Sequence, residues 1–156
     1  MRILVDSSVW IDYFKGKKNA EILNPLIDDN LICINDLILA EIVPYLKIQT
    51  NQDIEPPTEQ ALLQEASALV ASELGKPENY VMINIDPVRP MLFAGSNEPT
   101  AYLELKSIGL AESQTKGLSA ALCTLINKKT NIPTERIYIE FTDAPRSMWG
   151  WNKSTF

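Results

Sequence analysis

The chain has 156 residues, 46% of them hydrophobic, with a net charge of −6 and no histidine. This length fits one ordinary domain with a closed core, and a second full domain does not fit. Without histidine, Ser-His-Asp and Cys-His catalysis and every histidine-containing metal site are excluded, so acid–base chemistry must use carboxylates, lysine, tyrosine or an amine. The acidic balance argues against a nucleic-acid binder, because phosphate binding needs a basic face.

The sequence predicts a cytoplasmic protein without membrane contact. It has no run of about 18 apolar residues. It also has no signal peptide, since Asp6 interrupts the first apolar stretch, Ile3 to Val5. Cys33 and Cys123 have neither a metal-binding nor a redox spacing, so we expect both to be buried, reduced thiols.

The first forty-three residues have a pattern of their own. Asp6 ends a short apolar strand, and residues 37–43 are expected to form a helix that follows Asn35-Asp36 and carries Glu41. This part resembles the start of a PIN-domain ribonuclease of the toxin–antitoxin kind, whose first and second acids match Asp6 and Glu41. The resemblance implies a truncated PIN-like extension over residues 1–43, because the second half of such a domain has been replaced.

The remaining residues, 44–156, repeat one pattern of strand, helix and strand. Each predicted strand alternates apolar and polar residues, and each predicted helix has an apolar stripe at helical spacing. From Tyr45 to Tyr80, and from Tyr102 to Tyr138, corresponding tyrosines stand about 35 positions apart, as expected for two copies of one unit. The expected strands are residues 45–50, 80–85, 102–107 and 137–141, and the expected helices are residues 56–74 and 113–130.

Two strand–helix–strand units predict an α/β fold in which a four-stranded sheet carries both helices on one face. We expect the other face to be apolar and uncovered, and therefore to be buried against other subunits. Residues 44–47 fit both the end of the PIN-like helix and the first strand of the sheet. We expect the strand, because its partner strands are present.

Three motifs stand in residues 44–156: Pro-Met-Leu-Phe-Ala-Gly-Ser at 90–96, Tyr-Leu-Glu-Leu-Lys-Ser-Ile-Gly at 102–109, and Trp-Gly-Trp-Asn at 149–152 with Ser-Thr-Phe at 154–156. They resemble the macrophage migration inhibitory factor family of tautomerases. This resemblance implies the tautomerase fold and a homotrimer in which three sheets surround a central channel. The segment Trp149–Trp151 would then be an edge strand at the contact between subunits.

The resemblance makes Pro44 the catalytic base. In this family the base is the amine of an N-terminal proline, and Pro44 is the proline in register. Inside the chain its nitrogen is an amide conjugated with the carbonyl of Val43, and an amide nitrogen is not a base. Valine can be encoded by GTG, a bacterial start codon, so initiation at position 43 followed by loss of Met would free the amine. Otherwise Pro44 only opens a strand.

The resemblance also supplies substrate-binding residues. Lys76 matches the lysine that binds the substrate carboxylate, Ile108 the residue whose backbone amide lines the pocket, and Tyr138 an aromatic from the neighbouring subunit. From the residues alone, Lys76 fits a solvated lysine after a helix, Ile108 a core residue at a strand end, and Tyr138 an ordinary sheet aromatic. Glu140 stands where the best-known members have Asn, so a role there as acid donor does not carry over. Phe141 and Trp151 could supply apolar pocket wall.

The function expected from these residues is that of an isomerase, a keto–enol tautomerase of aryl α-keto acids such as phenylpyruvate. We expect no cofactor and no metal, and the partners would be the small α-keto acid and further copies of the chain. One alternative is a catalytically silent binding protein in which Pro44 stays acylated. A remote alternative is metal-dependent RNA cleavage through Asp6 and Glu41, although two carboxylates hold a divalent ion poorly.

Overall fold

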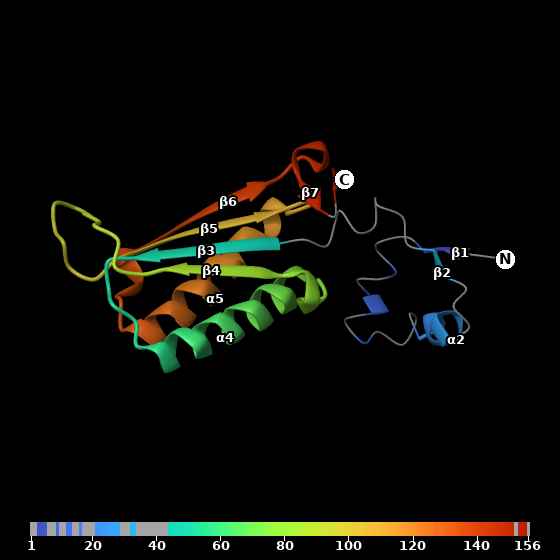
Figure 1. Cartoon of the computed structure of the whole chain (residues 1–156), viewed down its shortest axis with the longest axis horizontal. Helices are drawn as coiled ribbons and strands as arrows, with labels where there is room; N and C mark the ends of the chain where they lie inside the picture. Colours follow the sequence, from blue (N-terminus) through green and yellow to red (C-terminus); the bar gives the residue numbers. More distant parts are fainter. Residues whose placement is uncertain are drawn as a thin grey trace.

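The computed structural model describes residues 3–5, 9, 12–13, 16, 21–28, 32–33, 44–151 and 153–155 (Figure 1). Before Pro44 these include β1 (Ile3–Leu4), α2 (Leu23–Asp28) and β2 (Ile32–Cys33), with β1 and β2 paired in parallel. The strand expected before Asp6 is therefore present. Asp6 itself, and the expected helix that carries Glu41, lie outside the described residues.

A four-stranded mixed sheet forms the centre of the fold. Its strands are β3 (Pro44–Thr50), β4 (Met82–Asp86), β5 (Ala101–Ser107) and β6 (Ile137–Asp143), in the order β4-β3-β5-β6. β3 pairs antiparallel with β5, and the two outer pairs, β3 with β4 and β5 with β6, are parallel. The predicted strands are confirmed, including the strand at residues 44–47, which a PIN-like helix would have replaced.

Both long helices, α4 (Pro56–Leu74) and α5 (Glu112–Thr130), cover one face of this sheet, as predicted (Figure 1). Their apolar stripes meet the alternate residues of β3 and β5 that point toward them. β4 begins at Met82 rather than at Tyr80, because Glu78–Tyr80 form a short 3₁₀ turn before it. The fully buried side chains between helices and sheet include Leu46, Ile48, Leu62, Val70, Leu103, Leu105, Leu118, Leu122 and Ile126.

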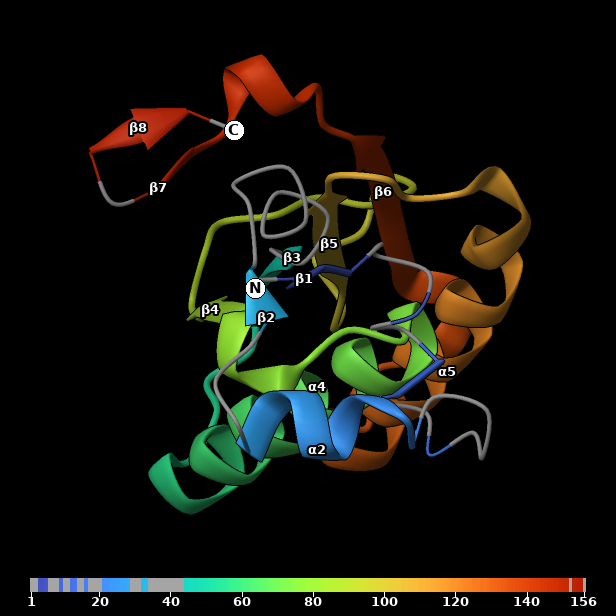
Figure 2. The same cartoon turned by 90° about the vertical axis from the view of Figure 1, so that its right-hand side faces the viewer.

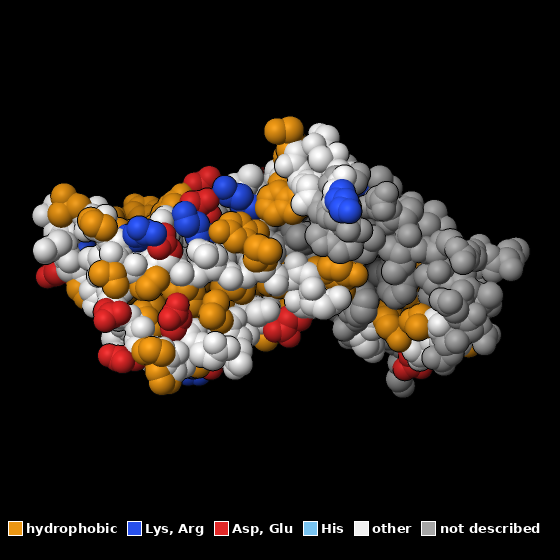
Figure 3. All heavy atoms as spheres, viewed as in Figure 1, with side chains coloured by type: hydrophobic (Ala, Val, Ile, Leu, Met, Phe, Trp, Pro, Cys, Tyr) orange, Lys and Arg blue, Asp and Glu red, His pale blue; other side chains and the backbone are white. Residues whose placement is uncertain are grey.

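The expectation of an apolar face opposite the helices is wrong. That face carries charged and hydroxylated side chains, because the alternate positions of β3, β5 and β6 are polar. Lys47 Nζ lies 3.9 Å from Glu104 Oε1 across β3 and β5, Lys106 Nζ lies 2.9 Å from Glu104 Oε2, and Tyr102 donates a hydrogen bond to Glu140. Figure 3 shows basic and acidic side chains intermingled over the strands. This face is suited to contact with water rather than to a dry interface.

The C-terminal residues form a separate small hairpin (Figure 2). After a 3₁₀ turn at Arg146–Met148, β7 (Gly150–Trp151) pairs antiparallel with β8 (Ser154–Thr155). The expected strand at Trp149–Trp151 is thus present, but within the described part of the chain it pairs with β8. None of the helices that the structure describes is long and apolar enough to cross a membrane.

Candidate functional site

Pro44 lies at the first position of β3, where its side chain is fully buried. A proline is tolerated at the start of a strand because it has no N–H to donate to the ladder. Its register partner on β5 is Ser107, the last residue of that strand. The candidate base is therefore held at one defined end of the sheet, next to the turn that leaves β5.

Lys76 reaches the same end of the sheet from α4. The helix stops at Gly75, which adopts the left-handed conformation with φ 65°, and the N–H of Lys76 bonds the carbonyl of Ala71 at 2.9 Å. The side chain then turns toward β5, where Nζ donates to Ser107 Oγ and to the carbonyl oxygen of Ile108, each at 2.7 Å. The helix stop thus directs a cation to the strand end that pairs with Pro44.

The structure brings Pro44, Lys76 and Ile108 together, and it adds Ser107, which the sequence reasoning missed. Ser107 is fully buried, and its hydroxyl accepts the hydrogen bond from Lys76. The sequence did offer one indication of Ser107: it is a polar residue at the end of a predicted strand, directly before Ile108. A hydroxyl that is buried there must form a hydrogen bond with a neighbouring group. Ile108 is 3% exposed and forms part of the wall of this region.

Trp149, which the sequence analysis places in an edge strand at a subunit contact, also packs within the chain. Its side chain packs on the small buried cluster of Ile108 and Ala144. Phe141, in contrast, was expected as pocket wall, but it packs against the core between sheet and helices. The alternation of β6 explains this, since a residue adjacent to the open-face Glu140 must point to the helices. The side chain of Trp151 lies outside the described part.

Tyr138 is not brought to Pro44 within one chain. It is 62% exposed, and its register partner on β5 is Tyr102. The residue of β6 that pairs with Ser107 is Asp143, and the five residue steps from Tyr138 to Asp143 correspond to about 16 Å at the ordinary rise of a strand. Within a single chain the aromatic and the proline therefore lie at opposite ends of the sheet.

Glu140 lies on the open face beside this tyrosine and is already engaged. It accepts a hydrogen bond from the Tyr102 hydroxyl, and this bond raises the pKa of Tyr102 to about 12. Its direct neighbour on β5 is Glu104, whose like charge is offset by Lys47 and Lys106. Glu140 is thus part of a charge network across the sheet.

Comparison with known proteins gives the same assignment for most of the chain. A family model described as macrophage migration inhibitory factor (MIF) matches residues 43–156. The macrophage migration inhibitory factor of Xenopus tropicalis is 39% identical over 117 residues, which cover 73% of this chain and 99% of that protein. A homolog from Brugia malayi is 40% identical over 115 residues, with the same coverage.

The chain belongs to the MIF family. A solved structure of the MIF homologue from Prochlorococcus marinus superposes with a TM-score of 0.69 at 45% sequence identity. The superposed part covers 72% of this chain and 98% of the Prochlorococcus chain. The matched part is the four-stranded sheet with its two helices, so the MIF-like tautomerase fold is the fold of this protein from β3 onward.

A PIN-domain model also matches, over residues 3–78. It overlaps the MIF match over 43–78, where the structure has β3 and α4 of the MIF-like fold. The two acids expected from the PIN resemblance, Asp6 and Glu41, lie outside the described residues. In the residues that are described, no three Asp, Glu, Cys or His side chains are grouped closely enough to hold a metal ion.

Proposed function

We propose that a form of this protein that begins at Pro44 is a keto–enol tautomerase of aryl α-keto acids such as phenylpyruvate. The observation that carries the proposal is the contact of Lys76 Nζ with Ser107, the register partner of Pro44. A candidate base and a candidate carboxylate-binding cation thereby lie at the same end of the sheet in a chain of the MIF family. Enolisation of a keto acid needs a base next to the carbon acid and a group that holds the substrate carboxylate.

The proposed base is the secondary amine of an N-terminal Pro44. Burial and the neighbouring ammonium of Lys76 both disfavour the protonated amine, so its pKa would be drawn down toward neutrality. The amine takes a proton from C3 of the keto acid, the C–H electron pair becomes the C2–C3 double bond, and the carbonyl π pair moves onto the C2 oxygen, which takes a proton from water. The hydroxide left behind takes the proton from the Pro44 ammonium, so the amine is regenerated. The reverse steps return the ketone.

Lys76 would bind the substrate carboxylate, with the backbone amide of Ile108 beside it. Two acceptors, Ser107 Oγ and the Ile108 carbonyl, hold the ammonium in place before substrate arrives. This preorganisation lowers the cost of binding, because a flexible lysine would otherwise lose side-chain entropy.

The aromatic wall of the pocket would come from a second copy of the chain. Tyr138 is exposed and lies at the far end of the sheet from Pro44. A homotrimer supplies it if β6 of one subunit lies beside the Pro44 end of the next. In such a trimer the charged open face of each sheet would line a water-filled central channel, which agrees with the ion pairs of Lys47, Glu104 and Lys106 on that face.

The silent binding protein is the second candidate, and one observation favours it for the 156-residue chain. Its Pro44 nitrogen is in a peptide bond, and the side chain is fully buried. In that chain the pocket can bind a ligand but has no base.

The MIF match begins at residue 43, the position that an initiator Met would occupy, which supports a form that starts at this junction.

The test compares phenylpyruvate conversion by the 156-residue chain and by the form that begins at Pro44, each verified by intact mass. The shorter form has its own core, since the main cluster of described buried residues starts at Leu46. The Xenopus tropicalis relative matches over 117 residues, which make up 99% of its own length, so a chain of about this size is a complete protein there. We expect activity only in the shorter form. Equal activity of both forms would show that the Pro44 amine is not the base.

Two controls bear on the amine itself. Acetylation of the free Pro44 should abolish activity, and Pro44→Gly in the shorter form should retain part of it through a primary amine. The 156-residue chain should also show no Mg²⁺- or Mn²⁺-dependent RNA cleavage. Metal-dependent cleavage that disappears in Asp6→Ala or Glu41→Ala would instead support a PIN-type ribonuclease.

A further inference from the structure

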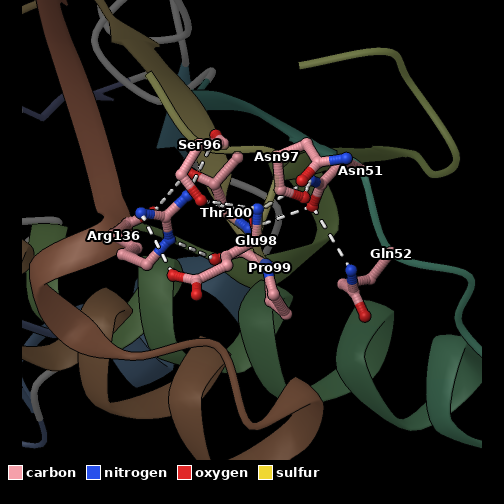
Figure 4. A network of polar contacts seen from close by, with 8 residues as sticks. All are labelled: Asn51, Gln52, Ser96, Asn97, Glu98, Pro99, Thr100 and Arg136. Carbon is pink, nitrogen blue, oxygen red and sulfur yellow. Dashed lines mark hydrogen bonds and ion pairs between the residues drawn. The ribbon is translucent and has the colours of Figure 1, made fainter. Parts of the chain in front are cut away.

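Arg136, the last residue of the 3₁₀ turn before β6, has a largely buried side chain with 11% exposure. Its guanidinium donates to three successive parts of the loop before β5. Nε bonds the Pro99 carbonyl at 2.8 Å, and Nη2 lies 3.1 Å from the Glu98 carbonyl and 3.4 Å from the Ser96 carbonyl. Figure 4 shows the guanidinium directed into this loop, while the side-chain amide of Asn51 donates to the Asn97 and Glu98 carbonyls from the other side.

The loop presents Phe93 through a tight turn. The N–H of Phe93 donates to the Ser96 carbonyl at 2.9 Å, and the N–H of Ser96 donates back to the Phe93 carbonyl at 3.0 Å. Ala94 and Gly95 between them both have positive φ, 52° and 73°. This geometry fixes the direction in which Phe93 leaves the turn, and the bond from Arg136 to Ser96 ties the turn to the start of β6.

Phe93 lies between Arg136 and Tyr138. The guanidinium carbon of Arg136 is 5.1 Å from the centre of the Phe93 ring, a cation–π contact. The Phe93 and Tyr138 rings are 5.3 Å apart and meet edge to face at 67°. Tyr138 is otherwise 62% exposed, so Phe93 is a specific support for a tyrosine ring that projects toward solvent.

We propose that Arg136 and Phe93 are positioning residues that set the orientation of the Tyr138 ring for the aryl group of the substrate. Arg136 fixes the turn and the face of Phe93, and Phe93 fixes the tilt of Tyr138. Neither residue touches the reacting atoms. The value of this support for substrate binding rests on the proposed function, in which Tyr138 lines the pocket of a neighbouring subunit.

The direct test is the ¹⁹F NMR spectrum of the 156-residue chain labelled with 3-fluorotyrosine. The chain has five tyrosines, and Tyr138→Phe identifies the resonance of Tyr138. We expect Phe93→Leu and Arg136→Lys each to shift that resonance. Leucine keeps an apolar side chain but removes the ring, and lysine keeps the charge but lacks the planar fork that bonds several carbonyls. An unmoved Tyr138 resonance in both variants would overturn the proposal.

Kinetics of the form that begins at Pro44 supply the second readout. Loss of the aromatic support should raise KM for phenylpyruvate roughly 2- to 10-fold and leave kcat nearly unchanged, since Pro44 is untouched. Phe93→Tyr, which keeps the ring, should restore the wild-type KM. A shifted resonance with unchanged KM in Phe93→Leu would show that the site does not use the orientation of Tyr138, and the proposal would fail.

Arg89→Lys is the matched control, because Arg89 lies in the same loop but is exposed and bonds Asp86. It should leave both the Tyr138 resonance and KM unchanged. An equal effect of this control would mean that any change in the loop acts on Tyr138, against a specific role of Arg136. If the unaltered short form is inactive, the proposed function fails, and the resonance alone decides whether Arg136 and Phe93 position the ring.

Discussion

The ammonium of Lys76 is fixed by two neighbours of unequal kind, a hydroxyl that a mutation can remove and a backbone carbonyl that it cannot. Lys76→Ala in the form that begins at Pro44 should raise KM for phenylpyruvate, because a charge-assisted contact is worth about 1.5–3 kcal/mol. Ser107→Ala should raise KM less, since the Ile108 carbonyl still holds the lysine. Steady-state kinetics measure both effects. The exposed Lys116 on α5 offers a control, and Lys116→Ala should leave KM unchanged. Unchanged kinetics in Lys76→Ala would remove this lysine from the site.

The Tyr102–Glu140 pair predicts a pH dependence. The hydrogen bond to Glu140 raises the pKa of Tyr102 from 10.0 to about 12, so the folded state favours the protonated phenol. The stabilisation by this bond is complete below pH 10.0 and is lost as pH rises through about 12. Phenolate absorbance, with Tyr102→Phe as the difference, should show this late titration in the wild type. Glu140→Gln should return the pKa toward its ordinary value, and a wild-type Tyr102 that already titrates there would contradict the pairing.

The end of α4 determines where the side chain of Lys76 points. Gly75 has φ 65°, where a side chain is strained, so Gly75→Ala should lower the free energy of unfolding by roughly 1–2 kcal/mol. Gly117 is a control of opposite sign. It lies inside α5, and an added Cβ would meet Glu73 Oε2 at an ordinary 3.7 Å, so Gly117→Ala should stabilise by roughly 0.5–1 kcal/mol. Urea denaturation measures both, and a stabilising Gly75→Ala would contradict the assigned helix end.

The strands and helices were predictable because their information is local. Apolar periodicity and the breakers Gly75 and Asn131 located the helices, and both residues do adopt left-handed conformations at the helix ends. The polarity of the open face could also be predicted from β5, where Glu104 and Lys106 alternate with leucines. The expectation of an apolar face came instead from the two-layer architecture, in which only one face of the sheet is covered by helices. Local patterns carry no such information about Arg136. Its contacts reach carbonyls about 40 positions earlier in the chain, and only the folded structure brings these together.

One chain holds the residues of the proposed site in two separate groups. Pro44, Lys76 and Ser107 converge at one end of the sheet, whereas Tyr138 and its supports Phe93 and Arg136 lie toward the other. The proposed trimer, in which each subunit completes the site of the next, would resolve this separation. The charged open face can then remain hydrated, and the contacts between subunits fall to apolar side chains at the margins of the sheet.

The margin beside Tyr138 carries the apolar side chains that such a contact needs. Leu92, next to Phe93 in the loop before β5, is 73% exposed, and Tyr138 itself is 62% exposed. If β6 and this loop meet a neighbouring subunit, burial of these side chains stabilises the assembly. Sedimentation equilibrium should then give three times the 17.5 kDa of one chain.

Leu92→Glu should shift this equilibrium toward the monomer, because an unpaired carboxylate buried at an apolar contact costs several kcal/mol, roughly what a buried ion loses on leaving water. Ala120→Glu is the matched control. Ala120 is exposed on α5, which covers the face of the sheet opposite to the proposed centre, so its substitution should leave the trimer intact. A wild-type protein that is a stable monomer at micromolar concentration would rule out a site shared between subunits. A trimer that survives Leu92→Glu and dissociates with Ala120→Glu would place the contact on the helices instead of beside Tyr138.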